Sequence, residues 1–191
     1  MLTRVSLALF LAALAGLAWS QPDPTLAQKL RQGGYVLYLR HTSTDFSQND
    51  SRMQSYEDCA NQRNLTDKGR DEARAVGAHI KRLGIPIGPV HASPFCRTME
   101  TARLAFGRAE RTEEVRGGPA NTNDPTRYDP LRKLLAIRPP SGKNNVISSH
   151  GNPFYAVFGP PYLAEGELAV VEPSAFVVVG RIRIEDWQAF H

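Results

Sequence analysis

The sequence predicts a three-layer α/β domain with a mainly parallel central sheet. Short apolar runs typical of strands alternate along the chain with amphipathic runs typical of helices. Near the C-terminus, two apolar runs flank the turn at Pro173–Ser174, which predicts a terminal hairpin. Strands that alternate with helices pair in a parallel sheet whose faces the helices cover. With 191 residues, the chain is long enough for one domain with a sizeable core.

Residues 1–20 predict a cleavable secretory signal. Arg4 supplies one positive charge, and an apolar run follows from Val5 to Ala18. Ala18 and Ser20 are small residues at the −3 and −1 positions of a cut before Gln21. The run is short and rich in alanine for a membrane span, although a retained signal-anchor is the alternative. We therefore expect a secreted or periplasmic protein without a membrane span after cleavage.

The remaining segment, 21–191, is expected to form one catalytic domain without a linker or internal repeat. Removal of residues 1–20 takes away one arginine and no acid, so the formal net charge of +4 falls to +3. Basic residues are interleaved with acids and form no stripe with aromatic residues, which argues against nucleic-acid binding. A mild positive charge suits a small anionic substrate.

Export to an oxidising compartment bears on whether the two cysteines form a disulfide. Cys59 and Cys96 are the only pair in the chain, and an oxidising compartment would allow a disulfide between them. Two buried free thiols are the alternative, because spacing along the chain does not show that two residues are adjacent in space.

The first half of the domain predicts helix, strand, loop and helix in turn. Residues 25–34 are expected to form a short helix closed by glycine, and residues 35–39 a strand covered on both faces. The polar segment 41–64 has no clear periodicity, and a loop of this length is usually functional or mobile. Residues 65–84 then predict a helix with Thr66 as its N-cap. Four apolar residues share one face of that helix: Ala73, Val76, Ile80 and Leu83.

The second half repeats the alternation, and each of its helices contains a proline near the predicted start. Ser93 and Pro94 are expected to start one helix that Gly107 ends, Asp129 to cap the next, and Asn152 to cap the last. The predicted strands are residues 88–93, 144–148, 167–173 and 175–184.

Cationic side chains follow three of the predicted strands. Arg40 and His41 follow the first strand, Arg97 lies just past the second, and His150 follows the strand at 144–148. In open α/β sheets the ligand site lies beyond the carboxyl ends of the strands. Guanidinium forks match the oxygens of a phosphate, and an imidazole supplies a nucleophile or a donor. These residues therefore predict a phosphate cradle with a nucleophile at its floor.

Four segments in order resemble those of the histidine phosphatase superfamily, which includes the cofactor-dependent phosphoglycerate mutases. "YLRHTSTD" resembles the Arg-His-Gly motif, "NLTDKGRDEA" the Leu-Thr-x-x-Gly segment, "ASPFCRTMETA" the Ser-Pro-x-x-Arg-Thr-x-x-Thr-Ala segment, and "VISSHGN" the segment of the second histidine. The resemblance spans residues 35–152 and implies a phosphoglycerate mutase-like fold. It implies that His41 attacks phosphorus and becomes a phosphohistidine, while Arg40, Arg97 and His150 bind the phosphate oxygens. It implies neither a metal nor a cofactor.

The chain departs from the superfamily pattern in three places. Thr42 replaces the motif's glycine, Ser47 stands where mutase-like members often have a phosphate-binding asparagine, and Gly117 stands where many relatives carry a glutamate as general acid. Glu167, at the start of a predicted strand, is our first candidate for the missing acid. Two more carboxylates on neighbouring loops are alternatives: Glu114 and Asp124.

The predicted function is an exported, metal-independent phosphomonoesterase that acts on a small phosphorylated substrate. The chain also loosely resembles the secreted lipopolysaccharide core heptose phosphatases of the superfamily, partly through "GPPYLAEGELAVVEP". A phosphate-ligand binding module without turnover is one alternative, and a mutase-type phosphotransferase that needs a bisphosphate cofactor is another. The physiological substrate and the oligomeric state stay open.

Overall fold

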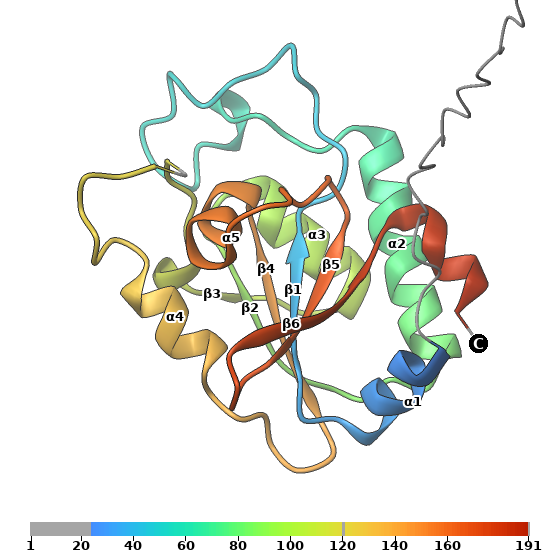
Figure 1. Ribbon diagram of the computed structural model, residues 1–191. Helices are drawn as coiled ribbons and strands as arrows, with labels where there is room; N and C mark the ends of the chain where they lie inside the picture. Colours follow the sequence, from blue (N-terminus) through green and yellow to red (C-terminus); the bar gives the residue numbers. More distant parts are fainter. Residues whose placement is uncertain (1–23, 120, 191) are drawn as a thin grey trace, which may run out of the picture.

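The computed structural model describes residues 24–119 and 121–190 (Figure 1). Its six-stranded sheet has the order β3-β2-β4-β1-β5-β6. The strands are β1 (Val36–Arg40), β2 (Ile87–Ala92), β3 (Glu110–Arg111), β4 (Asn144–Ser149), β5 (Leu168–Glu172) and β6 (Val177–Ile182). The strands β3, β2, β4 and β1 are mutually parallel, and β5 runs antiparallel to both of its neighbours. The predicted mainly parallel sheet with a terminal hairpin is confirmed.

Helices cover both faces of the sheet and complete three layers. One core joins α1, α2 and α3 to the sheet, together with the C-terminal 3-10 segment η3, and the other joins α4 and α5 to the opposite face. These elements are α1 (Pro24–Gln32), α2 (Asp67–Arg82), α3 (Cys96–Phe106), α4 (Asp129–Leu135), α5 (Gly151–Phe158) and η3 (Ile184–Ala189). Alternate residues of β1 from Val36 to Leu39 enter the two cores, so these four positions are buried on both faces of the sheet.

The N-terminus of α2 follows the prediction. The Thr66 hydroxyl accepts a hydrogen bond from the Gly69 amide at 3.0 Å and so caps the helix. Gly69 also allows the helix to approach the loop after β1, because a Cβ there would lie 2.0 Å from the Ser43 carbonyl oxygen. The four residues predicted for the apolar face are all buried: Ala73, Val76, Ile80 and Leu83.

Three predicted helix caps are wrong. The helix expected from Ser93 starts at Cys96, because the Ser93 amide first donates to the carbonyl of Ser148 beside it in the sheet. Asp129 is the first residue of α4 and does not cap it. Helix α5 has His150 at its N-cap, while Asn152 donates instead to the carbonyl of Gly118.

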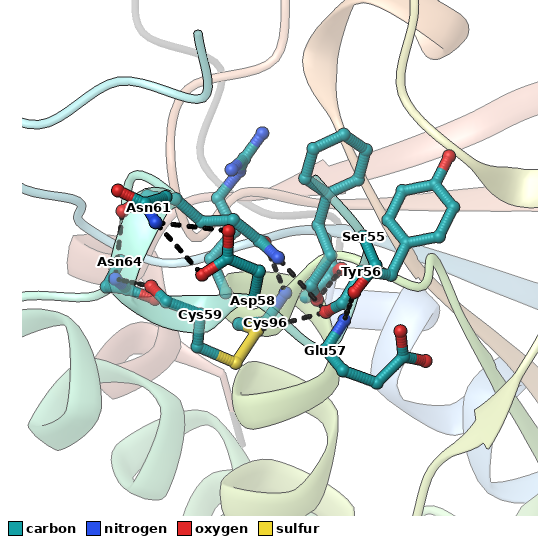
Figure 2. Close-up of a disulfide and its surroundings, with 12 residues drawn as sticks. Ser55, Tyr56, Glu57, Asp58, Cys59, Asn61, Asn64 and Cys96 are labelled. Atoms are coloured by element: carbon teal, nitrogen blue, oxygen red, sulfur yellow. Dashed lines mark hydrogen bonds between the residues drawn. A yellow bond between two sulfur atoms is a disulfide. The ribbon is translucent and has the colours of Figure 1, made fainter. Parts of the chain in front are cut away.

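The segment 41–64 is a long loop with one short 3-10 turn, η1 (Cys59–Asn61). In Figure 1 it is drawn in light blue to cyan and arches over the end of the sheet toward which β1 points. A disulfide joins Cys59 of this loop to Cys96 at the start of α3, with the two Cα atoms 5.8 Å apart (Figure 2). The expected pairing is confirmed, and it holds the loop against the first turn of α3.

The prediction of a signal at residues 1–20 lies outside the described residues. None of the helices in the described ranges is long and apolar enough to cross a membrane.

Candidate active site

A polar pocket of about 320 Å³ lies beyond the carboxyl ends of β1, β2 and β4. These strands are neighbours in the sheet, so the residues that follow them meet at one place. The residues around the pocket come from both halves of the chain: Arg40, His41, Gln48, Asn49, Asp50, Arg63, Phe95, Arg97, Gly117, Gly118, His150, Gly151, Asn152 and Tyr162. The structure thus brings together Arg40, His41, Arg97 and His150, as the sequence predicts.

His41 is held in the tautomer that a nucleophile needs. Its side chain is almost fully buried, and Nδ1 lies 3.0 Å from the carbonyl oxygen of Thr42. A carbonyl oxygen can only accept, so Nδ1 carries the proton and Nε2 is left with a free lone pair. Burial is the main cause that lowers the pKa of His41 well below its ordinary value, and nearby guanidinium charges lower it further. The imidazole is therefore neutral and able to attack an electrophile.

His150 lies beside His41 in a fixed orientation. The two imidazole ring centroids are 5.5 Å apart in an edge-on arrangement. Nε2 of His150 contacts the Ser93 hydroxyl at 2.8 Å, and the backbone carbonyl of His150 accepts a hydrogen bond from Tyr38. Burial, followed by the charge of Arg97, lowers the pKa of His150 well below its ordinary value. Ser93, predicted only as a helix start, thus serves as a contact of the second histidine.

Three arginines surround the pocket, and each lies over an aromatic ring. The guanidinium of Arg40 lies over Tyr162, that of Arg63 over Phe46, and that of Arg97 over Phe95, at 5.2, 4.8 and 4.5 Å from the ring centroids. The Nε atoms of all three arginines are buried and have no hydrogen-bond partner within the protein. A buried donor without an acceptor is costly, so these N–H groups indicate a place for an anion.

Arg63 and Asp50 are pocket residues that our sequence analysis missed. Both lie in the aperiodic loop after β1, where no hydrophobic pattern marks individual positions. Arg63 directly precedes the Asn-Leu-Thr segment before α2, and this nearness to a motif is the one signal that could have indicated it. The Asp50 carboxylate accepts two hydrogen bonds from the guanidinium of Arg97, at 2.9 and 3.1 Å.

The structure does not bring Glu167 into the pocket. Its side chain is 2% exposed and pairs with Arg181 through both oxygens, at 2.6 and 2.9 Å. One oxygen also accepts the Ala164 amide. The carboxylate next to His41 belongs instead to Glu165, which lies 3.8 Å from Nδ1, on the side away from the free nitrogen, and also binds Arg40 and Thr44.

The remaining residues that the sequence singled out lie either in the pocket lining or outside it. Glu114 and Asp124 are exposed and do not line the pocket. Ser47 is exposed and donates its hydroxyl hydrogen bond to Asp45, outside the pocket lining. Gly117 lines the pocket, and a Cβ there would lie 3.2 Å from Nε2 of His150. No group of three or more His, Cys, Asp or Glu residues in the described ranges is arranged to hold a metal ion.

Comparisons with known proteins agree with this geometry. Residues 36–117 match the model of the histidine phosphatase superfamily (branch 1), and a search of curated proteins gave no match. The structure of the protein histidine phosphatase SixA complexed with tungstate is 20% identical, with a TM-score of 0.54, over 80% of this chain and 98% of that one. A mutant phosphoserine phosphatase from Entamoeba histolytica in complex with phosphoserine is 14% identical, with a TM-score of 0.55, over 80% and 98%. The solved structures show that the chain has the fold of these phosphatases, and residues 36–117, which carry three of the four motifs, are similar to the histidine phosphatase superfamily.

Proposed function

We propose that this protein is a phosphomonoesterase that transfers the phosphoryl group to Nε2 of His41 and then hydrolyses the phosphohistidine. One observation carries the proposal. The free nitrogen of a neutral, buried imidazole shares a pocket with three guanidinium groups whose Nε–H donors lack an acceptor. Such an arrangement suits a phosphate beside a nucleophile, because charge develops on the phosphate oxygens in the transition state.

In the first step, the lone pair of His41 Nε2 forms a bond to phosphorus as the bond to the ester oxygen breaks. Arg40, Arg97 and His150, with Arg63 added by the structure, would hold the phosphate oxygens. The carbonyl of Thr42 accepts the Nδ1 hydrogen bond and stabilises the positive charge that His41 gains. In the second step, water attacks the phosphohistidine and releases inorganic phosphate.

The substrate class we favour is a small phosphate ester with a hydrophilic leaving group. The amide side chains of Gln48, Asn49 and Asn152 line the pocket. Amides and hydroxyls pair well with a polyol, so a sugar phosphate fits better than an apolar ester. This choice is compatible with the heptose phosphatases that the sequence resembles, and that assignment remains a refinement of the proposal.

Two further parts of the proposal concern the cellular location of the protein and its activity without a metal ion. The N-terminal segment and the disulfide between Cys59 and Cys96 support export to an oxidising compartment. The guanidinium groups can supply the positive charge that a metal supplies in other phosphatases, so we expect activity to persist in EDTA. Loss of activity on chelation, restored by a divalent ion, would argue for a metal-dependent mechanism.

The decisive test of the proposed function is the trapping of label on His41. The protein should be mixed with a ³²P-labelled aryl phosphate and quenched in alkali, in which phosphohistidine is stable. We expect label on His41 and a loss of turnover of at least about 10⁴-fold in His41→Ala. The matched control is His79→Ala, because His79 lies outside the pocket and stacks on Trp187. A protein that binds phosphate but traps no label would be a binding module.

A further inference from the structure

The pocket needs a proton donor that none of the residues expected from the sequence supplies. An alkoxide is a poor leaving group, so an alkyl phosphate reacts slowly unless the ester oxygen is protonated as the bond breaks. Gly117 has no side chain to give a proton, and both oxygens of Glu167 pair with Arg181. Among the described residues that line the pocket, Asp50 is the one with a carboxylate.

We propose that Asp50 is the general acid of this enzyme, an assignment that rests on the function proposed above. Asp50 lines the pocket and lies in the loop after β1, which arches over the end of the sheet toward which β1 points (Figure 1). Its side chain is 32% exposed, so the carboxylate is open to a bound ester. Arg97 comes from α3, while Arg40 and His41 lie at the end of β1. Asp50 reaches the pocket from the loop that follows β1, which also carries Arg63.

The contacts of Asp50 fix its carboxylate at the phosphate subsite. Both oxygens accept hydrogen bonds from the guanidinium of Arg97, and Oδ1 also accepts the backbone amide of Arg63 at 2.9 Å. Asp50 thus occupies Arg97 donors that a phosphate would use. An entering phosphate ester competes for the Arg97 fork and leaves the carboxylate beside the ester.

That exchange leaves the Asp50 carboxyl free of the Arg97 fork and within reach of the ester, where it can donate a proton to the leaving oxygen. As His41 Nε2 bonds to phosphorus and the ester bond breaks, the proton of Asp50 moves to the leaving oxygen and gives an alcohol. A proton from solvent then restores the Asp50 carboxyl, and the water that attacks the phosphohistidine keeps its protons on the inorganic phosphate or loses one to solvent.

The test compares two leaving groups in Asp50→Asn. A p-nitrophenolate leaves without a proton, whereas the alkoxide of glycerol phosphate does not. We expect kcat for glycerol phosphate to fall by about 10²–10⁴-fold and kcat for p-nitrophenyl phosphate by less than about tenfold. Asp50→Glu should recover part of the alkyl activity. The matched control is Asp58→Asn on the same loop, a carboxylate outside the pocket lining that bonds Asn61 and should show no such selectivity.

Equal losses on both substrates, or no loss on either, would overturn the assignment. Equal losses would mean that Asp50 only positions Arg97, and an unchanged enzyme would mean that the proton comes from elsewhere. The aryl substrate also shows that the variant is folded. Label trapping on His41 in the unaltered protein is measured in parallel, so that failure of the phosphohistidine mechanism is seen separately from failure of the Asp50 assignment.

Discussion

Thr42 shows how a residue that departs from the superfamily motif fits beside His41, the proposed nucleophile. Its side chain is fully buried and turns toward α3, where Oγ1 lies 3.3 Å from the hydroxyl of Thr101. The bulk added in place of glycine therefore packs between the loop and the helix and does not enter the pocket lining. The backbone carbonyl of Thr42, which any residue would supply, still accepts the hydrogen bond from Nδ1 of His41.

Glu167 has a structural role at the residue scale. It forms a buried ion pair with Arg181 that joins the start of β5 to the end of β6. Glu167→Gln keeps the shape of the side chain but removes the charge, and leaves the guanidinium of Arg181 short of a charged partner. Because hydrogen bonds to charged groups contribute more than neutral ones, we expect the free energy of unfolding to fall by about 1.5–3 kcal/mol.

Urea denaturation of the Glu167→Gln variant measures this loss. Its activities on glycerol phosphate and p-nitrophenyl phosphate should change by the same factor, because Glu167 does not reach the pocket. A selective loss of the alkyl activity, with stability unchanged, would return Glu167 to the role of proton donor that the sequence suggested.

At the scale of elements, the loop 41–64 depends on contacts from elsewhere in the chain. The disulfide ties Cys59 to Cys96, the residue before Arg97. The side chain of Gln62 accepts the Cys96 amide and donates to the Tyr56 carbonyl, which bridges the loop to α3 a second time. Figure 2 shows this junction, with Asp58 and Asn61 bonded to each other on the loop side of the bridge. The loop positions Asp50 and Arg63 through these attachments.

Loss of the bridge should therefore lower both stability and activity. A 37-residue separation closed by a disulfide contributes roughly 2–4 kcal/mol in the chain-entropy model. We expect Cys59→Ser/Cys96→Ser to lose about that much free energy of unfolding and to show a higher KM for p-nitrophenyl phosphate, because Arg63 is less firmly held. Dithiothreitol should weaken the unaltered protein in the same way and leave the double variant unaffected. An unaltered KM in the double variant would show that the disulfide does not affect substrate binding in the pocket.

The same loop marks the limit of what the sequence could predict. The cap at Thr66, the apolar face of α2 and the residues at the ends of β1 and β4 follow from local patterns, and the structure confirms their places. Asp50 and Arg63 follow from no such pattern, because their places depend on partners 47 and 34 residues away in sequence. Asn152 failed as a cap for a similar reason, since its side chain bonds Gly118 and Tyr162.

At the scale of the whole molecule, the burial of the two pocket histidines affects both the proposed catalysis and the stability of the fold. Three guanidinium groups and two imidazoles lie around one pocket, and the imidazoles are neutral because burial opposes their protonation. His41, the proposed nucleophile, therefore keeps its free lone pair below the pH at which an exposed histidine is protonated. The same burial lowers the free energy of unfolding in acid, because both histidines can take up protons in the unfolded chain but resist protonation in the folded one.

Acid should therefore destabilise the protein in a definite pH window. His41 and His150 have folded-state pKa values well below the usual 6.5 of the unfolded chain. Below about pH 6.5 the unfolded state binds more protons than the native state, so the free energy of unfolding falls as pH falls. The slope is up to about 1.4 kcal/mol per pH unit for each histidine, and the decline continues until the folded-state pKa is reached. Above about pH 6.5 this contribution to stability is fully present.

Urea denaturation between pH 5 and pH 7.5 measures this slope before most carboxylates titrate. We expect stability to be level above about pH 6.5 and to fall below it. The double variant His41→Ala/His150→Ala should lose most of this slope. His79, whose pKa is also lowered by partial burial and by Arg82, is retained in both proteins and cancels in the comparison. An equal slope in the variant and the unaltered protein would show that the two pocket histidines are protonated in the folded state, and a neutral His41 nucleophile would then be excluded in that pH range.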